Sequence, residues 1–444
     1  MSRSGARVWL IPTAYVATSV VCAFALPRIE HAYFGSYTFD LSISSTQAYL
    51  SAAASGMMAL TAIVFSVAFV MVQFSAVAYS PRLVLLFVRD RLLFHTLGVF
   101  VATFVYSLWT LAWVDRGGSG AVPLFSATLV VVMVVVSMGL FSVLVQRVTD
   151  LQITNVLRLI GDKGREVIRE LFPRLDARQD ADHGNRAVSS SRTLLGPITQ
   201  TVKYSGNPRC IAKYDIAALV RQARAAGAVI EMVSAVGDTL VDDSLILRVR
   251  GGKTAVPEPS LLRAIRLETE RTFEQDPKYP IRLLVDIGIK ALSPAINDPT
   301  TAVQTIDQIE DLLRRLGRRE LDTGYAADAD GNLRLVFPTP SWDDYLALAF
   351  DEIRQYGATS VQVMRRLRSA LTGLEESLTS SARIEAVQKY LRRLDSMIEH
   401  SALEADDRLS ARQEDRQGLG LSRTRAEDPG VADTQRSYER SIMK

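Results

Sequence analysis

No Asp, Glu, Lys or Arg occurs between Asp40 and Arg82, and this gap limits the folds open to the chain more than any other feature. A helix on the surface of a water-soluble protein carries charged or polar residues on the face opposite its core. A gap of this length leaves no such face, so it indicates a helix surrounded by lipid. Most of the chain's 51 Lys and Arg and 48 Asp and Glu residues follow residue 150. We therefore predict an α-helical membrane domain in the first third and a water-soluble domain in the rest.

A helix needs about 20 apolar residues to cross the hydrocarbon core of a bilayer. Four stretches have this length and predict four transmembrane helices, at residues 8–26, 48–77, 92–114 and 121–145. The first stretch also resembles a secretory signal, because arginines precede it and Ala23, Phe24 and Ala25 form an A-x-A cleavage pattern. Retention and cleavage of this stretch therefore both stay open. Residues 78–94 are expected to form an amphipathic helix at the membrane surface.

The Lys and Arg residues near the ends of the spans predict the orientation of the protein, because cytoplasmic loops carry an excess of them. The basic ends fall on one side of the membrane: Arg3, Arg7, Arg82, Arg89, Arg91, Arg147 and Arg158. We expect a multi-pass protein of the cell inner membrane with both termini in the cytoplasm. The lipid bilayer is then its first partner, and a net charge of +3 gives no reason to expect a nucleic acid.

Small and polar residues recur on one face of span 2 and again in span 3. The candidate polar span face comprises Ser55, Ser66, Gln73, Thr103 and Ser107. Such residues let helices pack closely, and this is one interpretation. The other is that they line a polar pathway in a homo-oligomer, with Gln73 as its best indicator. Charged residues are absent from the predicted spans, and this argues against a charged-substrate transporter.

The remainder of the chain predicts a cytoplasmic α+β domain that is mostly helical with a small sheet. We expect a juxtamembrane helix and polar linker over 148–192, a small α+β subdomain over 193–256, a helical domain over 257–403 and a disordered tail over 404–444. Asp215 and Gly227 have the residue types that begin and end a helix. Further helices are expected over 261–273, 281–292, 342–374 and 383–403.

The stretch KALSPAINDPTT, residues 290–301, interrupts the helical pattern with two prolines. Pro294 disfavours helix at the preceding residue, and Asp298 followed by Pro299 predicts the start of the next helix. Punctuation between two helices is therefore one interpretation. A helix N-terminus also attracts anionic groups, so a ligand or partner site is the other. Its candidate residues are Ser293, Asn297, Asp298, Thr300 and Thr301.

No residue pattern points to catalysis. The chain carries no nucleophile motif, dinucleotide-binding glycine pattern or zinc-ligand spacing, and its two cysteines, Cys22 and Cys210, lie far apart. We therefore expect no enzyme activity, no cofactor, no catalytic residue and no metal site. Asp286 and Lys290, four residues apart on an expected helix, form a candidate ion pair.

Two phrases resemble a known family. ALSPAINDPTTAVQTID, with VFSVAFVMVQFSAVAYSPRLVLLFVRD upstream, is similar to bacterial predicted membrane proteins defined by a large domain of unknown function with N-terminal transmembrane spans. The resemblance covers residues 8–400. It implies an integral inner-membrane protein with a cytoplasmic domain, and it implies no activity.

Two functions therefore stay open. The first is an oligomeric channel or transport-like protein with a cytoplasmic regulatory domain. The alternative is a membrane-anchored scaffold or sensor whose cytoplasmic domain binds a partner or small ligand. The sequence names neither the ligand nor the ion, and a homo-oligomer is expected in the first case.

Overall fold

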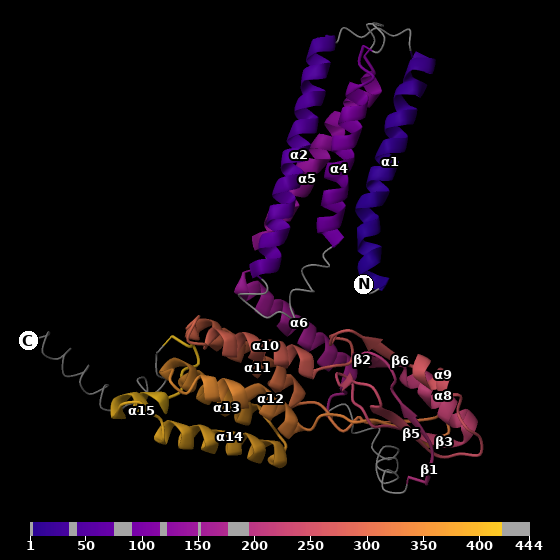
Figure 1. Ribbon diagram of the computed structural model, residues 1–444. Coiled ribbons are helices and arrows are strands. Elements are labelled where there is room, and N and C mark those ends of the chain that lie inside the picture. The colour runs from indigo at the N-terminus through magenta and orange to yellow at the C-terminus, as the bar shows by residue number, and fades with distance from the viewer. Residues whose placement is uncertain are drawn as a thin grey trace, which may run out of the picture. The chain divides into compact units, whose positions relative to one another are not determined.

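The computed structural model describes residues 3–34, 42–74, 91–115, 122–149, 152–175 and 195–419. The chain divides into an N-terminal unit, Met1–Val156, and a C-terminal unit, Leu157–Lys444. Residues 78–90 of the amphipathic helix predicted over 78–94 lie outside the described residues, as do residues 176–194 and the last part of the tail; residues 91–94 begin α4. Each unit is described below by itself (Figure 1).

The N-terminal unit is a bundle of four long helices (Figure 1). They are α1 (Arg3–Phe34), α2 (Ile43–Phe74), α4 (Arg91–Leu111) and α5 (Leu124–Thr149). Each contains a stretch that is long and apolar enough to cross a membrane: Leu10–Glu30, Ile43–Val70, Leu92–Leu111 and Leu124–Gln146. The four predicted spans are thus confirmed, and the first extends to Glu30 rather than ending at residue 26.

Helix α4 is the centre of this bundle, because its contacts with each of the other three helices are the most extensive in the bundle. Small side chains allow the approach: a Cβ atom added at Gly98 would lie 2.7 Å from the Tyr15 ring of α1. Large apolar side chains fill the remaining interior, among them Leu50, Met57, Phe100, Tyr106, Val130 and Leu144.

The C-terminal unit combines two small sheets with a layer of helices (Figure 1). Helix α6 (Ile153–Leu171) leads into it. The five-stranded sheet has the order β1 (Ile198–Lys203), β5 (Leu245–Gly251), β3 (Ala228–Met232), β8 (Leu333–Val336) and β7 (Tyr325–Ala327). The three-stranded sheet has the order β4 (Thr239–Leu240), β2 (Arg209–Tyr214) and β6 (Ile265–Glu268).

The predicted helix between β2 and β3 is confirmed as α8 (Ile216–Ala226). The side chain of Asp215 accepts a hydrogen bond from the Ala218 N–H, and Gly227 ends the helix at a φ of 64°. That left-handed conformation strains residues with a Cβ atom. Below α8, alternate strand residues such as Ile230 and Leu247 form the core of the sheet.

Helix α9 (Glu258–Arg263) lies beside α8 at the sheets, and its Leu261 belongs to their core (Figure 1). The helices on the other side of the unit are α10 (Lys278–Ala291), α11 (Pro299–Leu316), α12 (Trp342–Tyr356), α13 (Val361–Ser377), α14 (Ser381–Glu399) and α15 (Ala405–Ala411). The helix expected over 342–374 is in fact two helices, because the chain turns between them at Gly357, where a Cβ atom would lie 2.6 Å from the Val363 side chain.

Two further expectations are corrected. The helix predicted over 261–273 is replaced by the short helix α9 and strand β6, since residues 265–268 pair with β2 rather than with their own neighbours. The tail expected to be disordered from residue 404 begins with α15, and buried Asp415 follows it. Strands β7 and β8, from the range expected to be mostly helical, join the sheet of the preceding subdomain, where β8 pairs in parallel with β3.

Candidate ligand-binding cavity

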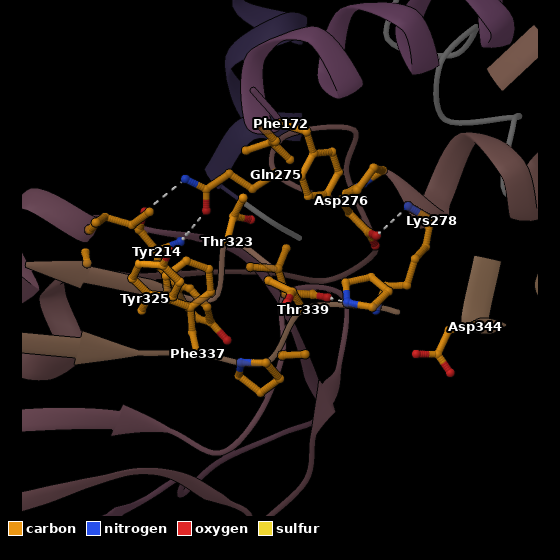
Figure 2. A pocket seen from close by; sticks show the side chains of 18 residues that line it. Phe172, Tyr214, Gln275, Asp276, Lys278, Thr323, Tyr325, Phe337, Thr339 and Asp344 are labelled. Carbon is orange, nitrogen blue, oxygen red and sulfur yellow. Dashed lines mark hydrogen bonds between the residues drawn. The ribbon is translucent and has the colours of Figure 1, made fainter. Parts of the chain in front are cut away.

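A cavity of about 490 Å³ lies in the C-terminal unit, lined by the end of α6, β2, the β7–β8 region and the start of α10 (Figure 2). Small-molecule sites have volumes of about 300–1,000 Å³, so this cavity has the size of such a site. Its wall is largely apolar, with four aromatic rings and a few polar groups. The residues that carry the argument are Phe172, Tyr214, Gln275, Asp276, Lys278, Tyr325, Phe337 and Asp344.

The first wall is the end of α6. Phe172 follows the last residue of this helix and is buried. A guanidinium N–H of Arg319 donates to the Phe172 carbonyl at 2.6 Å, and the N–H of Leu175 donates to the Arg318 carbonyl at 3.2 Å. The chain that leaves α6 is therefore bonded to the segment that follows α11. These bonds fix Phe172 as part of the cavity wall.

Gln275 holds the start of α10 against β2. Its side-chain oxygen accepts a hydrogen bond from the Tyr214 N–H at 2.9 Å, and its amide N–H donates to the Tyr214 carbonyl at 3.1 Å. The side chain thus takes the place of a neighbouring strand. The φ of Gln275 is 49°, a left-handed conformation that is uncommon for residues other than glycine.

Asp276 is the most deeply buried acid of the wall, with 2% of its surface exposed. One carboxylate oxygen, Oδ1, accepts a hydrogen bond from the Lys278 N–H at 3.1 Å (Figure 2). The other, Oδ2, has no hydrogen-bond partner among the described residues and lies 3.8 Å from a guanidinium nitrogen of Arg271. Burial raises the pKa of Asp276, and the charges of Lys278 and Arg271 oppose this effect.

Gly237 is required beside this carboxylate. A Cβ atom at this position would lie 2.5 Å from Oδ2 of Asp276, and the residue has a φ of 91°. The turn at Gly237 and Asp238 leaves room for the buried acid.

Tyr214 lines the cavity, and Tyr345 lies near its acids Asp276 and Asp344 without lining it. The Tyr214 hydroxyl donates to the Ser234 carbonyl, and its ring packs edge-on against Phe337 at 6.2 Å between centroids. Burial raises the pKa of Tyr214. Tyr345 of α12 is completely buried, and its hydroxyl has no hydrogen-bond partner within the described ranges. Burial raises the pKa of Tyr345 too, and the charges of Asp276 and Asp344 add to the effect.

The remaining charged groups are half-buried or exposed. Asp344 accepts hydrogen bonds from the N–H and hydroxyl of Ser341 at 2.8 and 2.7 Å, and these bonds lower its pKa. Lys278 reaches the Val236 carbonyl at 3.5 Å. The arrangement can therefore hold a small molecule with an apolar or aromatic body and a polar group directed at Lys278. Among the described residues, no group of three His, Cys, Asp or Glu side chains could hold a metal ion.

The candidate loop site has its polar groups bonded within the loop. Asp298 caps α11: its carboxylate accepts from the N–H of Thr301 at 3.1 Å and from the Thr301 hydroxyl at 2.6 Å. The Ser293 hydroxyl donates to the Lys290 carbonyl at 2.7 Å. Asn297 adopts a φ of 48°, and Asn297 and Thr300 are exposed. These bonds end one helix and cap the next, and this is the geometry that the interpretation as a break between two helices requires. These five residues do not line the cavity.

The candidate polar span face divides into two sets. Ser55, Ser66 and Gln73 are exposed on α2, whereas Thr103 and Ser107 are buried inside the bundle. A single chain therefore does not bring the five residues onto one surface. Asp286 accepts a hydrogen bond from Arg282 Nε at 2.6 Å, four residues before it. The ion pair of Asp286 with Lys290 stays a prediction.

Sequence reasoning missed the cavity because its wall comes from segments far apart in the chain. The one local signal is the run Gln275, Asp276, Pro277 and Lys278, in which an acid and a proline precede a helix. That signal predicts the start of a helix. It carries no information on the strand and the helix end that surround it.

Four long apolar helices, followed by a mostly helical unit with small sheets, define an α-helical membrane protein with a large C-terminal unit. The chain belongs to the family described as predicted membrane protein (DUF2254), whose model matches residues 5–373. This confirms the family resemblance drawn from the sequence.

Relatives over most of the chain are known by sequence. The chain is 27% identical over 397 residues to the uncharacterized protein Rv1290c of Mycobacterium tuberculosis (strain ATCC 25618 / H37Rv). The aligned region covers 86% of this chain and 74% of the relative. The uncharacterized protein Mb1321c of Mycobacterium bovis (strain ATCC BAA-935 / AF2122/97) has the same identity and coverage. No solved structure matches the chain.

Proposed function

We propose that the protein is a membrane-anchored sensor whose C-terminal unit binds a small molecule in the cavity beside Phe172. The observation that carries this proposal is the place of Phe172. It lies in the cavity wall and directly follows α6, the helix that continues the chain from the last apolar helix. A bound molecule that contacts this residue favours the arrangement in which the contact is made. Occupancy of the cavity can therefore be transmitted to α6.

Contacts along α6 support a role in transmission. Arg165 donates to Asp311 at 2.7 Å, and Gly164 lies so close to α11 that a Cβ atom would be 2.8 Å from Leu312. Helix α6 is thus bound to α11 at Gly164 and Arg165 and to the cavity at its end. A shift of its last turn would have to move these contacts as well.

The experiment is a binding measurement on the full-length protein in nanodiscs. Indole, benzamide, 4-hydroxybenzoate and adenosine serve as probes, and ligand-observed NMR detects their binding. Ala326→Phe fills the cavity, whereas Ala327→Phe places the same side chain on the exposed next residue of β7. We expect at least one probe to bind the wild type and Ala327→Phe but not Ala326→Phe. Binding of no probe, or equal binding by both variants, contradicts the proposal.

Hydrogen exchange tests the transmission step separately. A bound probe is expected to slow amide exchange at the end of α6, near Phe172, as well as at the start of α10. Protection limited to α10 would show binding without transmission, and the sensor proposal would then be wrong while the binding site stands.

A second proposal is the oligomeric channel, and one observation favours it. Ser55, Ser66 and Gln73 are exposed on α2, where a second copy of the chain would cover them. An amide facing lipid is unfavourable without a partner. The test is ion flux in liposomes: Gln73→Leu should abolish flux, and a monomeric protein in detergent would contradict a ring. Thr103 and Ser107, buried inside one chain, give this proposal no support.

We also propose that the protein lies in the inner membrane with both termini in the cytoplasm, and that the C-terminal unit binds rather than catalyses. The asymmetric arginines support the orientation. Reporter fusions at the two termini test it, and activity of a periplasmic reporter at either end would contradict it.

A further inference from the structure

One face of α4 carries hydroxyl groups inside the bundle. Thr96, Thr103, Ser107 and Thr110 are separated by seven, four and three residues, which places them on one side of the helix. All four are completely buried. They follow the helix for roughly 21 Å at about 1.5 Å per residue, most of the thickness of a hydrocarbon core.

Three hydroxyl groups in this region meet no partner with full hydrogen-bond geometry among the residues that the structure describes. They belong to Thr96, Tyr106 and Thr110, all at most 1% exposed, and the last two lie near each other and near Ser126. A buried hydroxyl without a partner is unfavourable, above all where lipid surrounds the bundle. Thr103 and Ser107 donate to carbonyls of their own helix, at 2.7 Å each, and their oxygens can still accept hydrogen bonds. The hydroxyl row can therefore bind water.

The neighbouring helices add hydroxyl groups beside the row. Ser19 of α1 lies at the level of Ala102, and its hydroxyl donates to the Ala102 carbonyl at 2.7 Å. On the other side, Ser137 of α5 lies 3.4 Å from Thr103, oxygen to oxygen. From Thr103 to Thr110 the successive hydroxyls of α4 lie at most about one helical turn apart, roughly 5–6 Å, whereas Thr96 lies seven residues, about 10 Å, before Thr103. One water molecule with a hydrogen bond to each side spans the shorter distance, and the longer one requires a chain of water molecules.

A titratable group stands at each end of the row. At one end, the Tyr15 hydroxyl and His95 Nδ1 are 3.2 Å apart. At the other, Glu30 accepts hydrogen bonds from the N–H groups of Phe125 and Ser126 and from the Ser126 hydroxyl, at 2.8, 3.2 and 3.1 Å. The expectation that the spans lack acidic residues is thus corrected, because the first span includes Glu30.

We infer that the interior of one bundle is a proton path that runs from His95 to Glu30 through buried hydroxyl groups and the water molecules they bind. At each step a hydroxyl or water accepts a proton on one side and releases another on the opposite side. One proton therefore enters as one leaves, and no group is changed by the passage. The path needs neither a second chain nor the cavity of the C-terminal unit.

The test is proton flux into liposomes that contain the full-length protein, a pH-sensitive dye and valinomycin with potassium. The wild type should carry protons faster than protein-free liposomes. Thr110→Val, which replaces the hydroxyl by a methyl group of similar size, and Glu30→Gln should each reduce the flux to the protein-free level. Thr128→Val is the matched control, because Thr128 is exposed on α5 and donates to the Leu124 carbonyl. Flux equal to that of protein-free liposomes, or equal flux in all variants, overturns the inference.

A second measurement requires no substitution. In labelled protein in bilayers, magnetisation transfer from water should reach the methyl groups of Thr103 and Thr110 sooner than that of lipid-facing Val135. Transfer to the threonines as slow as transfer to Val135 would show a dry bundle and also overturn the inference.

Discussion

Gln275 and Tyr214 are joined by two hydrogen bonds, of 2.9 and 3.1 Å, between the side-chain amide of one and the backbone of the other. The residues are far apart in the sequence and come from the start of α10 and the end of β2. This contact closes the cavity on one side and fixes the position of Asp276, the next residue. The position of the buried acid Asp276 thus depends on the Gln275 side chain, whose amide makes the backbone hydrogen bonds that a neighbouring strand would make.

Gln275→Ala should destabilise the C-terminal unit by about 1–3 kcal/mol, because the Tyr214 N–H and carbonyl lose their partners. Urea unfolding of the full-length protein in detergent, followed by near-UV circular dichroism, measures the change. Glu274→Ala is the control, since Glu274 is exposed and its ion pair with Arg266 is solvated. An equal effect of both substitutions would refute this account of Gln275.

Asp298→Ala should cost about 1 kcal/mol of stability, because it removes the cap of α11. Asp298→Asn should keep most of it, and Thr300→Ala, at an exposed position, should change little. Thermal unfolding measures all three. Loss of probe binding or of proton flux in an Asp298→Ala protein that stays folded would instead support a site in this loop.

Arg366→Met should destabilise the contact of α13 with α11 by about 3 kcal/mol, since it leaves acids without their buried partner. The Arg366 side chain is 7% exposed and bonds Asp307 at 2.7 Å and Glu310 at 2.5 Å. A double-mutant cycle with Glu310→Leu measures the coupling. Arg315→Met, at a half-exposed pair with Asp311, should cost at most about 1 kcal/mol.

Asp276 should make stability fall as the pH rises. Burial raises its pKa in the folded state above the ordinary value, so the folded protein holds a proton that the unfolded chain has released. Stability is then highest below the pKa of the unfolded carboxyl, about 3.9, and decreases as the pH rises through the raised value.

Asp276→Asn tests this linkage. The variant should unfold at a higher temperature than the wild type at neutral pH, and the difference should shrink as the pH falls toward about 4. A difference that is independent of pH, or that has the opposite sign, would contradict a raised pKa at this carboxyl.

The sequence by itself determined the features that depend on neighbouring residues. The charge-free stretch after Asp40 predicts lipid-facing helices, because a helix made of these residues has no charged face to expose to water. Asp215 with Gly227, and Asp298 with Pro299, predict helix ends because a cap is formed within a few residues. These predictions agree with the structure, since the interactions that they describe are local.

The tertiary structure decided what depends on distant segments. Residues 265–268 form β6 because β2 offers them strand partners, which outweighs their helical pattern. Thr103 and Ser107 lie in the interior of the bundle, whereas Ser55 is exposed on α2, because α4 is packed against the other three helices. The cavity unites Phe172, Tyr214, Asp276 and Phe337, and hydrogen bonds between those segments place them. Such contacts leave no periodicity in the sequence, and only folding brings their members together.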